Sequence, residues 1–271
     1  MTKTNMQKGF TLVELAIVMT IIGLLIGGIL KGQELMDNAR VSATVAQEKG
    51  YEAATTTFRD TYSAFPGDVP SANTRIPGCD GTTYKCQVAA ATAGDGVIGA
   101  NTWGTAYGIQ GTAAGYAAGA AAQADEPQMF WMHLLKANLI SGVTDAALLA
   151  ATPAAWAVTH PEAKMGGGFI AGYANGTAPP GSVALAGTGP SGTVLVIEQA
   201  PLTALTTTAS IQVMNPSRAA QIDRKLDDGK PATGFVQAYG VAASCFTSAA
   251  ANAYNEALTT KDCGLIMRIQ N

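Results

Sequence analysis

The residues of this chain that could do chemistry are few, and its cysteines are the first group to consider. The four cysteines are Cys79, Cys86, Cys245 and Cys263. Neither they nor the two histidines have the close spacing of a zinc site, and no Cys-x-x-Cys pair is present. An even number of cysteines in an exported chain favours two disulfides, for which four cysteines allow three connectivities. We expect the local pairs, Cys79 with Cys86 and Cys245 with Cys263, because short loops close at small entropic cost.

A single carboxylate, Glu14, stands inside the run from Phe10 to Leu30, which is otherwise uncharged. The run is long enough to cross a bilayer, which takes about 20 apolar residues. Lys3 and Lys8 precede it, so the N-terminus is expected in the cytoplasm and the rest of the chain outside it. A carboxylate in a spanning helix costs on the order of 2.5–3.5 kcal/mol at mid-bilayer, so Glu14 is expected to have a function and a partner.

The window Lys8-Gly9-Phe10-Thr11-Leu12-Val13-Glu14-Leu15 resembles the processing site of type IV prepilins and of the pseudopilins of type II secretion. In that family a membrane aspartyl protease cuts after the glycine and methylates the new N-terminal phenylalanine. The resemblance implies a cytoplasmic leader of residues 1–9, cleavage between Gly9 and Phe10, and N-methylation of Phe10. Glu14 of one subunit would then neutralise the Phe10 amine of its neighbour in a filament. The alternative is an uncleaved anchor with Glu14 near the lipid headgroups.

The elements that position these residues begin with one long helix. Apolar and small residues recur at steps of three or four beyond Leu30, which predicts a helix over 10–62, about 80 Å at 1.5 Å per residue. Phe65-Pro66-Gly67 marks its end. Residues 10–30 would form the membrane span and later the filament core, and the polar second half would pack an alanine-rich stripe on a sheet.

The remaining residues, 63–271, have short apolar runs separated by Gly, Pro, Asn and Thr, a pattern typical of a sheet-containing head. The predicted strands are 182–186, 193–199, 235–239 and 265–269. The first two are expected to form a hairpin through Gly187–Gly192. That loop fits G-x-G-x-x-G, but a β-branched run follows it rather than a helix, so a dinucleotide site is not expected.

Two further helices are expected in the head. One starts at Asp125-Glu126-Pro127 and ends at Ser141-Gly142, with His133 off its apolar face and exposed to solvent. The other starts at Asn215-Pro216, with asparagine as N-cap, and reaches Leu226.

A cluster of three aspartates lies at the end of that second helix: Asp223 in its last turn, and Asp227 and Asp228 just after it. Aspartates at a helix C-terminus oppose the macrodipole, so something should offset them. Their oxygens could bind calcium, as in the C-terminal loops of some pseudopilins, although the twelve-residue calcium-loop pattern is absent. The alternative is pairing with Arg224, Lys225 or Lys230, with no cofactor.

The composition excludes several function classes. With 16 Lys+Arg, 19 Asp+Glu and a formal charge of -3, the chain has no basic surplus and no dedicated nucleic-acid site. Charged residues make up 13%, about half the share of a soluble globular protein, which argues against a free cytosolic enzyme. No nucleophile elbow, phosphate loop or metal-spaced cluster supports an enzyme anchored to the membrane.

The resemblance therefore implies an α+β pilin fold, with a long N-terminal helix packed on an antiparallel sheet and a large decorated head. The expected function is structural, as a subunit of an extracellular type IV pilus; a type II secretion pseudopilin is the alternative. Expected partners are identical subunits in a helical filament, the prepilin peptidase/methyltransferase and the inner-membrane assembly machinery. The subunit would sit in the inner membrane with its head in the periplasm before it joins the pilus.

Overall fold

The computed structural model describes residues 10–79, 86, 93–99, 126–144, 155–179, 181, 189–201, 205, 210–248 and 251–269. The chain divides into two compact units, one ending at Arg40 and one beginning at Val41. The boundary falls inside the long helix, so the head unit includes the second half of that helix. The head predicted from the sequence, residues 63–271, lies wholly within this second unit.

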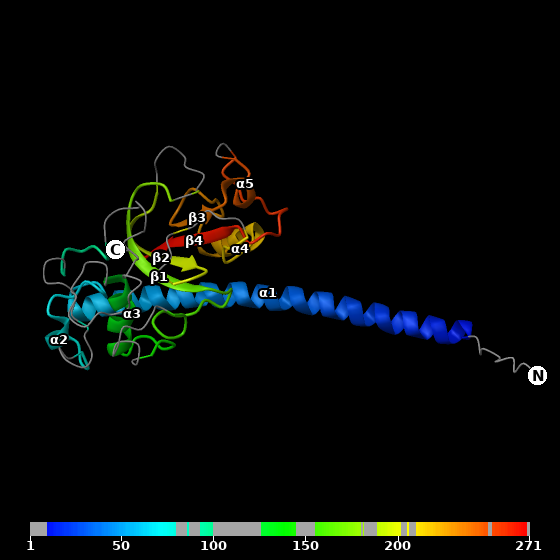
Figure 1. The fold of residues 1–271 in the computed structure, drawn as a ribbon, viewed down its shortest axis with the longest axis horizontal. Helices are drawn as coiled ribbons and strands as arrows, with labels where there is room; N and C mark the ends of the chain where they lie inside the picture. The colour runs from blue at the N-terminus through cyan, green and yellow to red at the C-terminus, as the bar shows by residue number, and fades with distance from the viewer. Residues whose placement is uncertain are drawn as a thin grey trace, which may run out of the picture. The chain divides into compact units, whose positions relative to one another are not determined.

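Helix α1 runs from Leu12 to Tyr62 and is drawn in blue to cyan in Figure 1. Up to Met36 its large apolar side chains are exposed. Its most apolar stretch of 18 residues is long and apolar enough to cross a membrane, and no residue of that stretch is buried. The predicted end at residue 62 agrees with the structure. The predicted start at residue 10 is two residues early, because Thr11 caps the helix.

From Val41 onward one face of α1 is buried in the head. The buried positions are Val41, Thr44, Glu48, Tyr51, Ala54, Thr55 and Phe58. Tyr51 and Phe58 belong to the same hydrophobic core as Phe169 and Leu195 of the sheet. The Tyr51 and Phe169 rings meet edge to face with centroids 5.2 Å apart. Helix α1 thus packs against the sheet as expected, but the buried face coincides only in part with the predicted alanine-rich stripe, because Ala46 and Gly50 of that stripe are exposed.

The sheet contains β1 (Gly168–Asn175), β2 (Ser191–Glu198), β3 (Val236–Gly240) and β4 (Cys263–Arg268). Its order is β1-β2-β4-β3, and every neighbouring pair is antiparallel. Residues that alternate along the strands divide between two cores. Phe169 and Leu195 belong to the core that includes α1, and Ile170 and Val196 belong to a second one. Both faces of the sheet are therefore covered.

The predicted strand 182–186 and most of its hairpin loop lie outside the described residues. The described partners of β2 are β1, which pairs along its whole length, and β4, which pairs at Val194–Ile197. The chain leaves β1 at Asn175-Gly176, where Gly176 N donates to Pro190 O at 2.9 Å. Strands β3 and β4 lie within one or two residues of their predicted bounds.

The predicted helices of the head are both present, and two short ones, α2 (Ala72–Arg75) and α5 (Ala242–Cys245), accompany them. Helix α4 spans Pro216–Leu226, and the Asn215 side chain caps it by accepting from Arg218 N. Helix α3 spans Glu126–Lys136, so the predicted end at 141–142 is wrong. Asn138 takes a positive φ of 55°, a conformation that ends helices.

Candidate functional site

The first turn of α1 holds Glu14 and Thr11 in a reciprocal arrangement. Thr11 N and Thr11 Oγ1 both donate to Glu14 Oε2, at 2.9 and 2.8 Å. Glu14 N donates back to Thr11 Oγ1 at 3.2 Å. This is a capping box, in which a threonine at the N-cap and a glutamate three residues later satisfy each other's backbone donors. The Thr-x-x-Glu spacing is the signal in the sequence from which this box can be predicted.

The capping box gives the Glu14 carboxylate hydrogen-bond partners within its own subunit. Both donors of Thr11 meet the same carboxylate oxygen, and the positive end of the helix dipole lies beside it. These contacts lower the cost of placing the carboxylate in an apolar setting. Phe10 precedes the helix and is 91% exposed. Gly9, the other residue of the expected cleavage site, lies outside the described residues.

The four cysteines form two disulfides with the expected local pairing. Cys79 joins Cys86 with Cα atoms 5.5 Å apart, and Cys245 joins Cys263 at 5.3 Å. The second bond links α5 to the first residue of β4 and so fixes the C-terminal loop to the sheet. Both bonds lie in the head rather than at the start of α1.

The three aspartates of the expected metal site come together at the C-terminal end of α4. One carboxylate oxygen from each of Asp223, Asp227 and Asp228 lies within 4.8 Å of the others. Asp223 is buried, Asp227 is half-buried and Asp228 is exposed. Burial, together with the charges of the other two aspartates, raises the pKa of Asp223 to about 7, although two hydrogen bonds oppose the shift.

Hydrogen-bond donors satisfy each carboxylate of this cluster. Asp223 accepts from Tyr254 Oη at 2.7 Å and from Gly229 N at 3.1 Å. Asp227 Oδ2 accepts from the backbone at the start of β3, and Asp228 accepts from Lys230 N and from the Thr233 hydroxyl. Two of the three cations expected as partners bond elsewhere: Arg224 pairs with Glu256, and Lys225 donates to Ser42 Oγ. The cluster thus organises the loop between α4 and β3.

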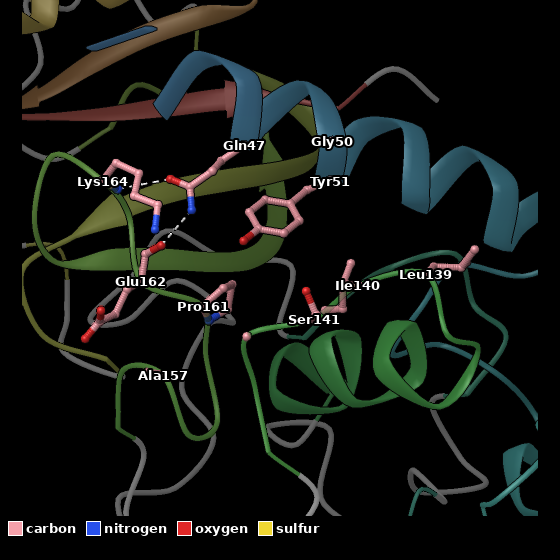
Figure 2. Close-up of a pocket in the computed structure, with 11 residues that line it drawn as sticks. Gln47, Gly50, Tyr51, Leu139, Ile140, Ser141, Ala157, Pro161, Glu162 and Lys164 are labelled. Carbon is pink, nitrogen blue, oxygen red and sulfur yellow. Dashed lines mark hydrogen bonds between the residues drawn. The ribbon is translucent and has the colours of Figure 1, made fainter. Parts of the chain in front are cut away.

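A cavity of about 530 Å³ opens between α1 and the segments that follow α3 (Figure 2). Gln47 links α1 to the segment before β1, because its side-chain amide donates to Glu162 O and accepts from Lys164 N, both at 3.0 Å. Its lining includes Tyr51 and Ser141 but no histidine or cysteine.

His133 does not lie where the sequence predicted. It is fully buried rather than exposed, because both of its ring nitrogens bond main-chain groups of distant segments. Sequence periodicity identified the apolar face of α3 but could not reveal polar partners 66 and 47 residues away.

Comparison with known proteins gives one match. Residues 4–30 match the family described as the prokaryotic N-terminal methylation motif, the signature of type IV prepilins and pseudopilins. No curated protein and no solved structure matches the chain. Proteins of this family are structural rather than enzymatic, and the long helix with a four-stranded antiparallel sheet is consistent with an α+β pilin fold. The N-terminal motif is thus that of type IV prepilins and pseudopilins, and the described fold is consistent with theirs.

Proposed function

We propose that the chain is a structural subunit of an extracellular type IV pilus. The observation that carries this proposal is the exposed apolar surface of α1 from Leu12 to Leu30, which begins at the capped Glu14. A surface of this size on a soluble protein would aggregate, so it must be covered by lipid or by other chains. Lipid covers it in the membrane, and identical helices cover it in the filament.

The position of Glu14 supports pairing between neighbouring subunits. Cleavage after Gly9 would leave an ammonium group on Phe10, three backbone bonds away from Thr11 N of the capping box. In the filament core this cation needs a counter-ion, and the carboxylate of a neighbour's Glu14 supplies one. Loss of either charge leaves the other buried, at a cost of about 3–5 kcal/mol for a broken buried pair.

The proposed life cycle follows from the order of these elements. The prepilin peptidase/methyltransferase removes residues 1–9 on the cytoplasmic side and methylates Phe10. The head stays in the periplasm, where its disulfides form. Inner-membrane assembly machinery then transfers α1 from lipid into the growing pilus.

Glu14→Ala tests the proposal, with Glu34→Ala as its control. Glu34 lies on the same helix and pairs with Lys31 at the surface, so its loss should cost little. Cells with Glu14→Ala should contain processed, membrane-bound subunit but few filaments, whereas Glu34→Ala cells should keep theirs. Sheared filaments are counted by electron microscopy, and their subunit is identified by mass spectrometry. Normal filaments with Glu14→Ala would contradict the pairing.

The same preparation separates the other functions. Abundant surface filaments made of this chain support the pilus. Retention of the chain in short periplasmic assemblies would indicate a type II secretion pseudopilin instead. A monomer that turns over a substrate would indicate an enzyme.

A further inference from the structure

His133 lies on α3, and its two ring nitrogens contact main-chain groups of two other segments. Gly67 N donates to Nδ1 at 2.9 Å, and Nε2 lies 2.8 Å from Cys86 O. A carbonyl oxygen only accepts hydrogen bonds, so Nε2 carries the ring proton, and Nδ1 accepts without one. The head therefore selects one tautomer of neutral histidine.

These three residues, His133, Gly67 and Cys86, form what we call the His133 clamp. Gly67 belongs to the turn that follows α1, and Cys86 closes the disulfide with Cys79. The imidazole also stacks on Phe58 of α1, with centroids 6.1 Å apart and planes 9° from parallel. One side chain thus joins α1, the turn after it, α3 and the disulfide segment.

The turn after α1 packs tightly against the backbone of α3, the helix that carries His133. Gly67 has a φ of 88°, and a Cβ built on it would lie 2.5 Å from Glu126 O and 3.2 Å from Phe130 N. Its backbone is therefore in contact with the backbone of α3. A proton on Nδ1 would point at Gly67 N–H across 2.9 Å, and two donors cannot bond each other. Only separation of the turn from α3 would relieve this contact.

In the part of the chain that the structure describes, no charged side chain forms a hydrogen bond or ion pair with His133. Burial lowers its pKa to about 4, and only the Cys86 carbonyl opposes this shift. Asp68, next to Gly67, accepts from Gly94 N and Gly96 N, and Glu126 on α3 accepts from Gly99 N. On α1, Arg59 lies over the Phe65 ring, and on α3, Lys136 is half-buried in the last turn.

We propose that the His133 clamp is an acid-sensitive switch: protonation of His133 releases Gly67 in the turn after α1, and the Cys86 carbonyl, from α3, while the sheet stays folded. The sheet keeps its own ladders of hydrogen bonds, which do not involve the clamp. The disulfide still holds Cys86 to Cys79 in the open form, so the opening is local.

The direction of the effect follows from the two states. In the open form His133 would titrate near its ordinary pKa of 6.5, whereas in the closed form its pKa is about 4. Acid therefore favours the open form as the pH falls below 6.5, about tenfold per pH unit. The gain levels off near pH 4, at roughly 300-fold in total for a difference of about 2.5 units.

NMR of the full-length protein in detergent micelles, with labelled histidine and backbone nitrogen, tests the switch. His133 should be the Nε2–H tautomer at pH 7 and should titrate with a midpoint between about 4 and 6.5, because opening on protonation raises the midpoint above the closed-form pKa of about 4. The Gly67 amide should lose its protection from exchange with the same midpoint, while amides of β2 and β4 keep theirs. A midpoint at or above 6.5, the other tautomer, or simultaneous loss of the sheet amides would overturn the proposal.

His133→Gln provides the matched variant, because its amide can donate to Cys86 O but does not titrate. In this variant the Gly67 amide should keep the same protection between pH 6.5 and 3.5. His160→Gln is the control: His160 is also buried, with its pKa lowered to about 3, but Thr159 is its hydrogen-bond partner. It should leave the Gly67 transition unchanged. An unaltered transition in His133→Gln would refute the switch, and if that variant does not fold, the wild-type tautomer and midpoint decide.

Discussion

Thr11 and Glu14 cap the start of α1 reciprocally, with Thr11 donating twice to Glu14 Oε2 and Glu14 N donating back to Thr11 Oγ1. The carboxylate proposed to pair between subunits is thus already oriented by its own chain. The same box sets the first residue of the helix at Leu12 and leaves Phe10 outside it.

Thr11→Val removes the hydroxyl from the capping box while it keeps the side-chain shape. Loss of an N-cap costs about 0.5–2 kcal/mol, so the first turn should fray and Glu14 should lose its fixed position. We expect several-fold fewer filaments from Thr11→Val and near-normal numbers from Thr11→Ser, which retains the hydroxyl. Equal filament counts for the two variants by electron microscopy would show that the cap is not needed.

Maturation should leave Phe10 as the first residue of the assembled subunit. The expected N-terminal peptide begins Phe10-Thr11-Leu12 and carries one methyl group on the amine. Gly9→Ala should be processed more slowly, because the protease must approach the backbone at this position closely. Mass spectrometry of sheared filaments measures both outcomes. An intact Met1 in assembled material would exclude cleavage.

Glu48→Gln should stabilise the head at alkaline pH. Glu48 is 1% exposed, and burial raises its pKa to about 7, with Lys49 opposing and Glu52 adding to the shift. Because the folded pKa exceeds the ordinary 4.5, Glu48 favours folding below pH 4.5 and loses that effect as the pH rises through 7. Above pH 7 the variant should gain on the order of 2 kcal/mol over wild type.

The measurement for Glu48 is the free energy of unfolding by denaturant at pH 4.5 and pH 8. Wild type and Glu48→Gln should differ little at the lower pH and clearly at the higher one. Glu52→Gln, at the half-buried neighbour that also contacts Lys49, should change stability little at both values. A stability gain that is equal at both pH values would contradict the buried charge as its cause.

Asp228→Asn should lower the pKa of Asp223 below about 7, because it removes one of the two neighbouring charges that raise it. Carboxyl carbon NMR reports this pKa directly. The same experiment with added calcium tests the metal hypothesis for the cluster. A bound calcium ion would raise the melting temperature of wild type and lower the pKa of Asp223 further, and Asp228→Asn should weaken both effects. Unchanged spectra at millimolar calcium would leave the cluster as an organiser of the loop.

Local signals in the sequence account for the elements that the sequence predicted well. The end of α1 follows from Phe65-Pro66-Gly67, and α4 follows from Asn215-Pro216, because caps and breakers act within a few residues. The two disulfides join cysteines that are 7 and 18 positions apart, so proximity along the chain anticipates them. The methylation motif is likewise one continuous segment.

The tertiary structure decided the features that depend on distant segments. Strand β1 was missed because its identity depends on which segment reaches the free edge of β2, and apolar pattern alone does not decide that. His133 was placed in solvent because its partners, Gly67 and Cys86, become neighbours only when α3 packs against the turn after α1. The sequence by itself determined the long helix, its processing motif and its charged residue. Only the tertiary structure decided which buried polar groups pair, because their hydrogen bonds to one another replace hydrogen bonds to water when the core forms.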